Sequence, residues 1–202
     1  MNKSLIAGAL CVLASLATPV LAAGDAEAGK TKSAVCAACH GADGKAIMAD
    51  YPNLAGQGAD YIVKQLRDFK EGRRENVLMT PMAMPLSDED MLDLAAYFSS
   101  LPAIEGVAAE ENLQLGMDIY RGGITSAEIP ACIGCHGPDG SGNPPAGYPA
   151  LHGQNGAYAV LQLQAFRSGE RDNDLNQMMR SVAHRMTDAE IQAVANYLQG
   201  LH

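Results

Sequence analysis

The chain of 202 residues has no tryptophan, and aromatic residues make up only 5% of it. After the first 23 residues, no apolar run approaches the roughly 20 residues that span a bilayer. Basic residues are also scarce, because 14 lysines and arginines stand against 23 acidic residues, for a formal net charge of −9. That balance argues against nucleic acid and anionic lipid surfaces as binding partners. The low aromatic content indicates that a small domain of this chain cannot bury a large core with its own side chains.

The first 23 residues have the pattern of an export signal. Lys3 precedes an apolar run from Leu5 to about Ala17, and small residues follow the run. A basic start, a short apolar core and a small-residue cleavage site are typical of a secretory signal peptide. We therefore expect residues 1–23 to be removed and residues 24–202 to work outside the cytoplasm. A retained membrane helix is the alternative, but the run is short for one.

The remaining residues contain one unit in two copies. Residues 51–57, YPNLAGQ, match residues 148–154, YPALHGQ, at an offset of 97, and further along the chain the two copies match at an offset of 100. Self-similarity over such a length indicates two copies of one fold. We expect two domains, residues 24–105 and residues 106–202.

Both copies carry helical patterns. Apolar residues recur at helical spacing between Ala59 and Lys70. Ser87 and Thr187 are each followed three residues later by an acidic residue, which is typical of the N-cap of an amphipathic helix. Loops rich in glycine and proline separate these segments, and no alternating strand pattern is present. The sequence predicts an all-α fold of two small tandem domains.

Residues 36–40, CAACH, and residues 132–136, CIGCH, are two copies of one motif at equivalent places in the repeat. C-x-x-C-H is the attachment signature of c-type haem. Cysteines three residues apart lie on one face of a helical turn, so both thiols reach the vinyl groups of one porphyrin and the next residue presents its imidazole to the iron. The sequence predicts two covalently bound haem c groups. The predicted attachment residues are Cys36, Cys39, Cys132 and Cys135, and the predicted iron ligands are His40 and His136.

Other roles for these cysteines fit the sequence less well. A thioredoxin-like dithiol does not require a histidine after each pair, and the βαβ pattern of that fold is missing. A zinc site made of two C-x-x-C pairs needs them roughly 15 to 20 residues apart. Here 93 positions separate Cys39 from Cys132. Disulfides within each pair are a third alternative and would constrain little of the chain.

Met79 and Met179 are the predicted sixth ligands of the two irons, because each lies seven residues before an aligned position, Leu86 or Met186. Neighbouring methionines lack this symmetry: Met82, Met84 and Met178 align with Val182, His184 and Leu78. Core packing is the alternative role for any one methionine, and His184 is the strongest rival ligand. Histidine and methionine on each iron leave no open position for a substrate. That pattern predicts an electron carrier of relatively high potential and not an enzyme.

Weaker predictions concern the surroundings of the haems. The loop around Pro52, or around Pro149 in the second copy, is expected to supply a backbone carbonyl to the N–H of the ligating histidine. Arg74 and Arg171 match in the repeat and are expected either to hold haem propionates or to be solvated at the surface. His152 is expected to be solvated or locally hydrogen-bonded. Without haem, the small aromatic-poor halves are expected to be unfolded.

The chain as a whole resembles the cytochrome c4 family, dihaem cytochromes of respiratory bacteria. Besides the two haem motifs, the resemblance rests on four segments, which are residues 24–29, 53–58, 86–98 and 197–202. It implies two class I cytochrome c folds with neighbouring haems, a histidine and a methionine on each iron, and a periplasmic location. The segment before Met79 is shorter than the family pattern.

The resemblance also implies the partners. Electrons would come from a quinol-oxidising complex or another cytochrome and pass towards a haem-copper terminal oxidase. Peripheral association with the membrane surface is compatible with the sequence. One alternative is the dihaem subunit of a dehydrogenase, such as a sulfide-oxidising flavocytochrome. Another is a dihaem peroxidase, which needs one haem with an opening sixth position, and the paired Met79 and Met179 argue against it.

Overall fold

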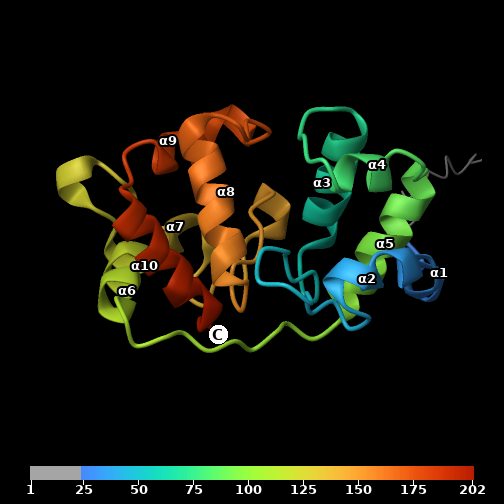
Figure 1. Cartoon of the computed structure of the whole chain (residues 1–202), viewed down its shortest axis with the longest axis horizontal. Helices are drawn as coiled ribbons and strands as arrows, with labels where there is room; N and C mark the ends of the chain where they lie inside the picture. The colour runs from blue at the N-terminus through green and yellow to red at the C-terminus, as the bar shows by residue number, and fades with distance from the viewer. Residues whose placement is uncertain (1–23) are drawn as a thin grey trace, which may run out of the picture.

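The computed structural model describes residues 24–202, so the predicted signal peptide lies outside the described residues. Two helical halves lie side by side and are joined by a linker that runs along both (Figure 1). Within the described residues the only β-type pairings are two isolated bridges, Ile124 with Ile129 and Asn143 with Tyr148. The predicted all-α fold is confirmed. No helix between residues 24 and 202 has the length and apolar character needed to cross a membrane.

The N-terminal half contains five α-helices and one short 3-10 turn. The helices are α1 (Ala26–Lys32), α2 (Ala37–His40), α3 (Ala59–Lys70), α4 (Met79–Ala83) and α5 (Asp88–Ser100), and the turn is Ser33–Val35. Helices α1 and α3 both pack against α5. This arrangement leaves α2 and α4, which carry the predicted iron ligands, on short segments between the longer helices.

The C-terminal half repeats this order. Its α-helices are α6 (Leu113–Gly122), α7 (Ile133–His136), α8 (Gly156–Ser168), α9 (Met178–Ala183) and α10 (Asp188–Gln199), and its 3-10 turns are Thr125–Ala127, Pro144–Ala146 and Leu175–Gln177. Helices α6 and α8 pack against α10 as α1 and α3 pack against α5. The internal repeat of the sequence is therefore a repeat of the helix order and packing.

A glycine permits the close crossing of the first and last helices in each half. A Cβ atom on Gly29 of α1 would collide with the backbone carbonyl of Asp93 on α5, and one on Gly116 of α6 would collide with the carbonyl of Ala193 on α10. Because the colliding atoms belong to backbones, the helices would have to move apart to accept a side chain. In each half, this close crossing fixes the first and last helices next to the core.

The closing helices begin as the sequence predicts. The Ser87 hydroxyl accepts a hydrogen bond from the backbone N–H of Asp90, whose carboxylate accepts one from the Ser87 N–H. Thr187 and Glu190 form the same reciprocal pair at the start of α10. Both capping boxes satisfy N–H groups that the helix itself leaves without partners. The predicted N-caps are confirmed.

Each half has its own apolar core. In the N-terminal half it centres on α5 and comprises Ile62, Leu94, Ala95, Tyr97 and Phe98. The C-terminal core is larger and includes Ile119, Tyr120, Ile129, Met186, Ile191, Val194 and Leu198. Cys36 and Cys132 are half-buried against their respective cores. The cores therefore support the segments that carry the predicted haem-attachment thiols.

The linker is attached to both halves along its length. A Cβ atom on Gly56 would collide with Ala103, so this part of the linker lies against the N-terminal half. Further along, the Asn196 side chain accepts from the N–H of Ala109 and donates to its carbonyl, and Gln199 donates to the carbonyl of Val107. The expected domain boundary, between residues 105 and 106, falls within this linker.

Candidate haem sites

The C-x-x-C-H motifs form single helical turns. In the first, the backbone N–H groups of Cys39 and His40 both donate to the carbonyl of Cys36, over 3.1 and 2.9 Å. In the second, Cys135 and His136 donate to the carbonyl of Cys132 over 3.2 and 3.0 Å. One turn of helix brings residues three apart to the same side, so each turn presents two thiols and an adjacent imidazole.

The thiols of these turns are free, and burial disfavours the thiolate form of the first cysteine in each turn. No disulfide joins the four cysteines. Burial raises the pKa of the Cys36 thiol, and it raises the pKa of the Cys132 thiol to about 11. A redox-active dithiol needs a thiolate with a lowered pKa, so this environment does not fit the thioredoxin-like alternative.

Backbone carbonyls orient the two histidines that are the predicted iron ligands. Nδ1 of His40 lies 3.0 Å from the carbonyl oxygen of Pro52, and Nδ1 of His136 lies 2.9 Å from that of Pro149. A carbonyl only accepts, so Nδ1 carries the proton and Nε2 keeps the lone pair that a metal requires. Both rings are 6% exposed, and burial lowers the pKa of each imidazole despite its carbonyl partner. The predicted carbonyl contacts are confirmed.

A tyrosine accompanies each histidine with almost the same geometry. The ring centroids of His40 and Tyr51 are 6.4 Å apart, and those of His136 and Tyr148 are 6.1 Å apart, both pairs with an interplanar angle of 52°. In the C-terminal half, the Tyr148 hydroxyl donates to Sδ of Met178 over 3.6 Å. Met178 therefore already has a polar partner.

Met79 and Met179 occupy matching half-buried positions, at the first residue of α4 and the second residue of α9. Three rival positions face solvent, because Met82, Met84 and His184 are all exposed, whereas Met178 is half-buried. In the N-terminal half, the Asn76 side chain accepts from the N–H of Met79 and fixes the start of the helix. The exposure of the rivals favours the paired methionines, whose role as ligands stays a prediction.

The two sites lie on either side of an interface in which the repeat is visible as pairs of hydrogen bonds. The Gln154 side chain accepts from the N–H of Asn53 over 2.8 Å and donates to its carbonyl over 3.0 Å. The Gln57 side chain contacts Ala150 in the same way, over 2.9 and 3.0 Å. Each glutamine thus holds the loop that follows the haem motif of the opposite half.

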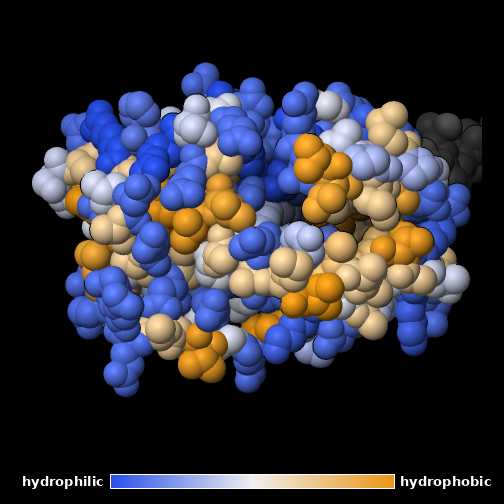
Figure 2. Space-filling model, viewed as in Figure 1, coloured by the Kyte–Doolittle hydropathy of each residue, from blue (hydrophilic) through white to orange (hydrophobic). Residues whose placement is uncertain are grey.

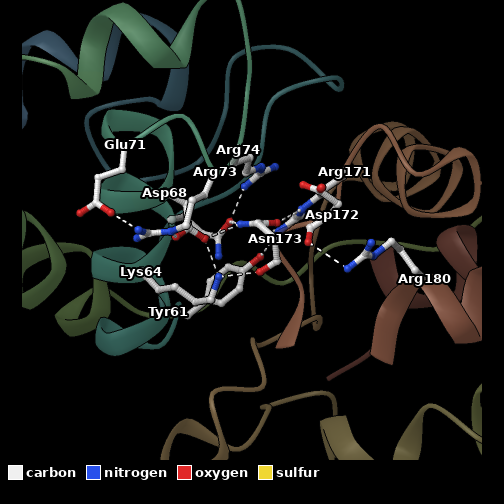
Figure 3. A network of polar contacts seen from close by, with 11 residues as sticks. Tyr61, Lys64, Asp68, Glu71, Arg73, Arg74, Arg171, Asp172, Asn173 and Arg180 are labelled. Carbon is white, nitrogen blue, oxygen red and sulfur yellow. Dashed lines mark hydrogen bonds and ion pairs between the residues drawn. The ribbon is translucent and has the colours of Figure 1, made fainter. Parts of the chain in front are cut away.

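Two arginines cross the same interface in a reciprocal pattern. Arg74 donates to the Tyr158 hydroxyl over 3.1 Å, and Arg171 donates to the Tyr61 hydroxyl over 2.9 Å. The side chains of Gln65 and Gln162 each accept from both guanidinium groups. Arg171 is only 8% exposed. The expectation that it is a solvated surface residue is wrong, because packing of the two copies against each other encloses it (Figure 3).

The positive charges of Arg74 and Arg171 fit a bound group that carries anionic substituents. Each guanidinium stacks on a phenylalanine of its own half, 4.6 Å from the Phe69 centroid and 4.4 Å from the Phe166 centroid. Neither Arg74 nor Arg171 forms an ion pair with a carboxylate of residues 24–202. Buried cations call for anionic partners. Two thiols, a free imidazole nitrogen and an unneutralised guanidinium in each half are the donor set that a haem with its propionates requires.

One cluster breaks the symmetry of the interface. Asp68 on α3 is buried and accepts from Lys64, Arg73 and, across the interface, Asn173 (Figure 3). Burial opposes its ionisation, but these hydrogen bonds outweigh burial and hold the pKa of Asp68 below its ordinary value. The matching residue of the second copy is Ala165, which carries no charge.

The environment of His152 also differs from the one expected from the sequence. Its Nε2 atom is buried and has no hydrogen-bond partner within residues 24–202, whereas solvation or a local hydrogen bond was expected. The sequence interpretation also missed the interface roles of Gln57, Gln154, Tyr61 and Tyr158. The sequence did contain a signal for these residues, because they match at the offset of 97. An internal repeat alone, however, does not show that its two copies pack against each other.

Comparison with known proteins agrees with this construction. Residues 26–102 and 124–202 each match the family described as Cytochrome c. The cytochrome c4 of Azotobacter vinelandii is 45% identical over 212 aligned positions, which cover all of both chains. A protein of Stutzerimonas stutzeri strain A1501 described as a thiosulfate dehydrogenase electron acceptor is 43% identical over 166 positions, or 80% of this chain and 76% of that one.

The solved structures include one of similar length and shape. The crystal structure of reduced recombinant cytochrome c4 from Pseudomonas stutzeri has a TM-score of 0.86 and 47% sequence identity. The match covers 89% of this chain and 100% of that chain. The predicted fold class, two tandem class I cytochrome c domains, is confirmed by this match and by the two separate family matches.

Proposed function

Because this chain belongs to the cytochrome c4 family and binds two covalently attached haem c groups, we propose that it is a periplasmic carrier that passes single electrons between respiratory redox proteins. A haem c group supplies a reversible one-electron change at its iron. The carrying observation is the pair of buried histidines, each with Nδ1 fixed on a proline carbonyl and Nε2 left for the metal.

The proposed haem-binding residues have the same roles in both halves. Two thiols would attach each haem, and a histidine and a methionine would ligate its iron. The proposed attachment residues are Cys36, Cys39, Cys132 and Cys135, and the proposed iron ligands are His40 with Met79 and His136 with Met179. Closed faces leave no position for a substrate, so we propose that the protein has no turnover of its own. The soft thioether favours the ferrous state and a high potential.

The interface serves the proposed function by holding the two sites in one arrangement. Gln57 and Gln154 fix the loops next to the histidines, and Arg74 and Arg171 place positive charge between the halves. We propose that these guanidinium groups bind haem propionates. A fixed interface keeps the distance between the two haem sites constant, as a carrier that holds two electrons on separate haems requires.

The location and the partners rest on the sequence pattern and the family. The signal-like residues 1–23 favour export to the periplasm. We propose a quinol-oxidising complex or another cytochrome as electron donor and a haem-copper oxidase as acceptor, with peripheral association at the membrane surface. The acidic balance of the chain favours partners with basic contact surfaces.

A second candidate function is that of electron acceptor for a dehydrogenase. It is favoured by the likeness to the thiosulfate dehydrogenase electron acceptor of Stutzerimonas stutzeri, which extends over 80% of this chain. The residues proposed to bind haem would keep the same roles, and only the donor would change. A dihaem peroxidase is less well supported, because it needs one iron without a closed sixth position.

The proposal is tested by redox titration of the purified holoprotein with optical detection. We expect two reversible one-electron steps at positive potentials, rapid reduction by a small mediator and no peroxide turnover. Sustained peroxide reduction, or a haem that binds cyanide rapidly in the fully oxidised protein, would contradict a pure carrier role. Reduction by a purified thiosulfate dehydrogenase, compared with reduction by a quinol-oxidising complex, distinguishes the two candidate donors.

A further inference from the structure

The two halves differ in how far their methionines are exposed to solvent. Within residues 24–202 the exposed methionines all lie in the N-terminal half, and they are Met48 at 52%, Met82 at 44% and Met84 at 55%. The methionines of the C-terminal half are half-buried or buried, namely Met117, Met178, Met179 and Met186. Solvent therefore reaches thioether sulfur readily in one half and poorly in the other.

The repeat does not require methionine at positions 82 and 84. The residues that match Met82 and Met84 at the offset of 100 are Val182 and His184, neither of which contains sulfur. Both copies nevertheless form a short helix at this place, α4 in the first and α9 in the second. Packing of the segment therefore does not explain the two thioethers, and their chemistry has to be considered.

Both exposed thioethers lie close to Met79 in the chain. Met82 follows Met79 by three residues within α4, and Met84 is the residue at the C-terminal end of this helix. Side chains three residues apart are neighbours on a helix surface, with Cβ atoms about 5 to 6 Å apart. Figure 2 shows that apolar side chains reach the surface over this α3–α4 end of the N-terminal half. The segment thus places exposed sulfur atoms beside the half-buried one of Met79.

A thioether is oxidised reversibly by two-electron oxidants. With hypochlorous acid, the sulfur gives up two electrons, the oxygen–chlorine bond breaks, a sulfur–oxygen bond forms, and a proton and a chloride ion leave. The resulting methionine sulfoxide is polar, and methionine sulfoxide reductases return it to methionine. At Met82 and Met84 the new oxygen would face solvent. At Met79 the same oxidation would destroy the soft thioether that is the proposed iron ligand.

Building on the proposed ligation of iron by Met79, we propose that Met82 and Met84 are reversible oxidation sites that consume two-electron oxidants such as hypochlorous acid before Met79 is oxidised. Each of the two thioethers consumes one molecule of oxidant and is then restored by a reductase. The C-terminal half has no such pair at the matching positions, so only its partial burial shields Met179. Protection of a haem ligand is a function distinct from electron transfer.

The test titrates the full-length holoprotein with hypochlorous acid and locates the sulfoxides by tandem mass spectrometry. In the wild-type protein we expect sulfoxide at Met82 and Met84 before any at Met79. The variant Met82→Leu with Met84→Leu keeps the apolar volume but cannot form sulfoxide. At the same dose it should contain about threefold more Met79 sulfoxide and lose the sulfur-to-iron band earlier. The control, Met117→Leu at a half-buried position of the other half, should leave the order of oxidation unchanged.

A gain-of-function variant tests the same idea in the C-terminal half. His184→Met places a thioether at the exposed position that matches Met84. We expect it to lower the amount of Met179 sulfoxide at a given dose by about half. Treatment of the oxidised wild-type protein with methionine sulfoxide reductases should restore Met82 and Met84 while both sulfur-to-iron bands stay intact.

The possible failures separate this proposal from the one on which it rests. Oxidation of Met79 as early as that of Met82 and Met84, or equal Met79 oxidation in the wild-type protein and the double leucine variant, would overturn the protective role and leave the carrier function intact. Absence of the sulfur-to-iron band from either haem before oxidant is added would instead overturn the proposed methionine ligation, and the protective role with it.

Discussion

Nη2 of Arg171 donates to the hydroxyl of Tyr61 over 2.9 Å and so joins residues that are 110 positions apart in the chain. The reciprocal contact, from Arg74 to Tyr158, gives the interface an approximate twofold character. The two halves are held mainly by such polar pairs and by glutamine side chains on backbone groups. The stability of the interface therefore depends on a few buried polar residues.

Arg171→Gln should loosen this interface. The substitution removes the bonds to Tyr61 and Gln65 and leaves the buried Tyr61 hydroxyl without its donor, whereas Gln65 still accepts from Arg74 and Asn173, so we expect the free energy of unfolding to fall by about 1 to 3 kcal/mol. Arg121→Gln, at an exposed position on α6, is the control and should change it by less than about 0.5 kcal/mol. Chemical denaturation followed by circular dichroism measures both, and equal midpoints would count against the buried network.

Gly116→Ala should separate α6 from α10. Its new methyl group would collide with the carbonyl of Ala193, so we expect a loss of about 1 to 3 kcal/mol of unfolding free energy, the usual cost of overpacking. Gly122→Ala on the same helix is the matched control, because no atom lies within 4 Å of the added Cβ. Thermal melting of the two holoproteins checks the prediction. A Gly116→Ala protein as stable as the control would show that the crossing is looser than described.

Acid should weaken the asymmetric cluster at the interface. The lowered pKa of Asp68 means that its stabilising effect is complete above the ordinary carboxyl pKa of about 3.9 and is lost as pH falls through the lower folded-state value. In that range the unfolded chain takes up the proton first, so stability declines with falling pH. We expect Asp68→Asn to flatten this part of the stability curve, as measured by denaturation at a series of pH values. Parallel curves for the two proteins would refute the assignment.

Haem attachment should be necessary for folding. In the variant in which serine replaces Cys36, Cys39, Cys132 and Cys135, we expect loss of most helical circular dichroism and of a cooperative melt, because each half is small and poor in aromatic residues. The control replaces the exposed residue Ser126 with alanine in the holoprotein and should melt normally. A cooperative melt of the cysteine-free protein would show that the cores suffice without haem.

Much of the fold and part of the site follow from local sequence. Ser87 with Asp90, and Thr187 with Glu190, specify helix starts by hydrogen bonds within four residues, and the chain pattern shows them directly. The contact of His40 with Pro52 is also readable, because only 12 positions separate the two residues. The burial of Arg171 was not readable, since it depends on how the copies pack, and that packing is set by contacts roughly 100 positions apart.

Near-infrared magnetic circular dichroism of the fully oxidised holoprotein tests the central claim most directly, because it reports the sixth ligand of each ferric haem. The account predicts two low-spin haems per chain, both with the sulfur-to-iron band of histidine and methionine coordination. Met179→His should remove that band from one haem and leave the other unchanged. A bis-histidine or high-spin signal from either haem of the wild-type protein would contradict the account.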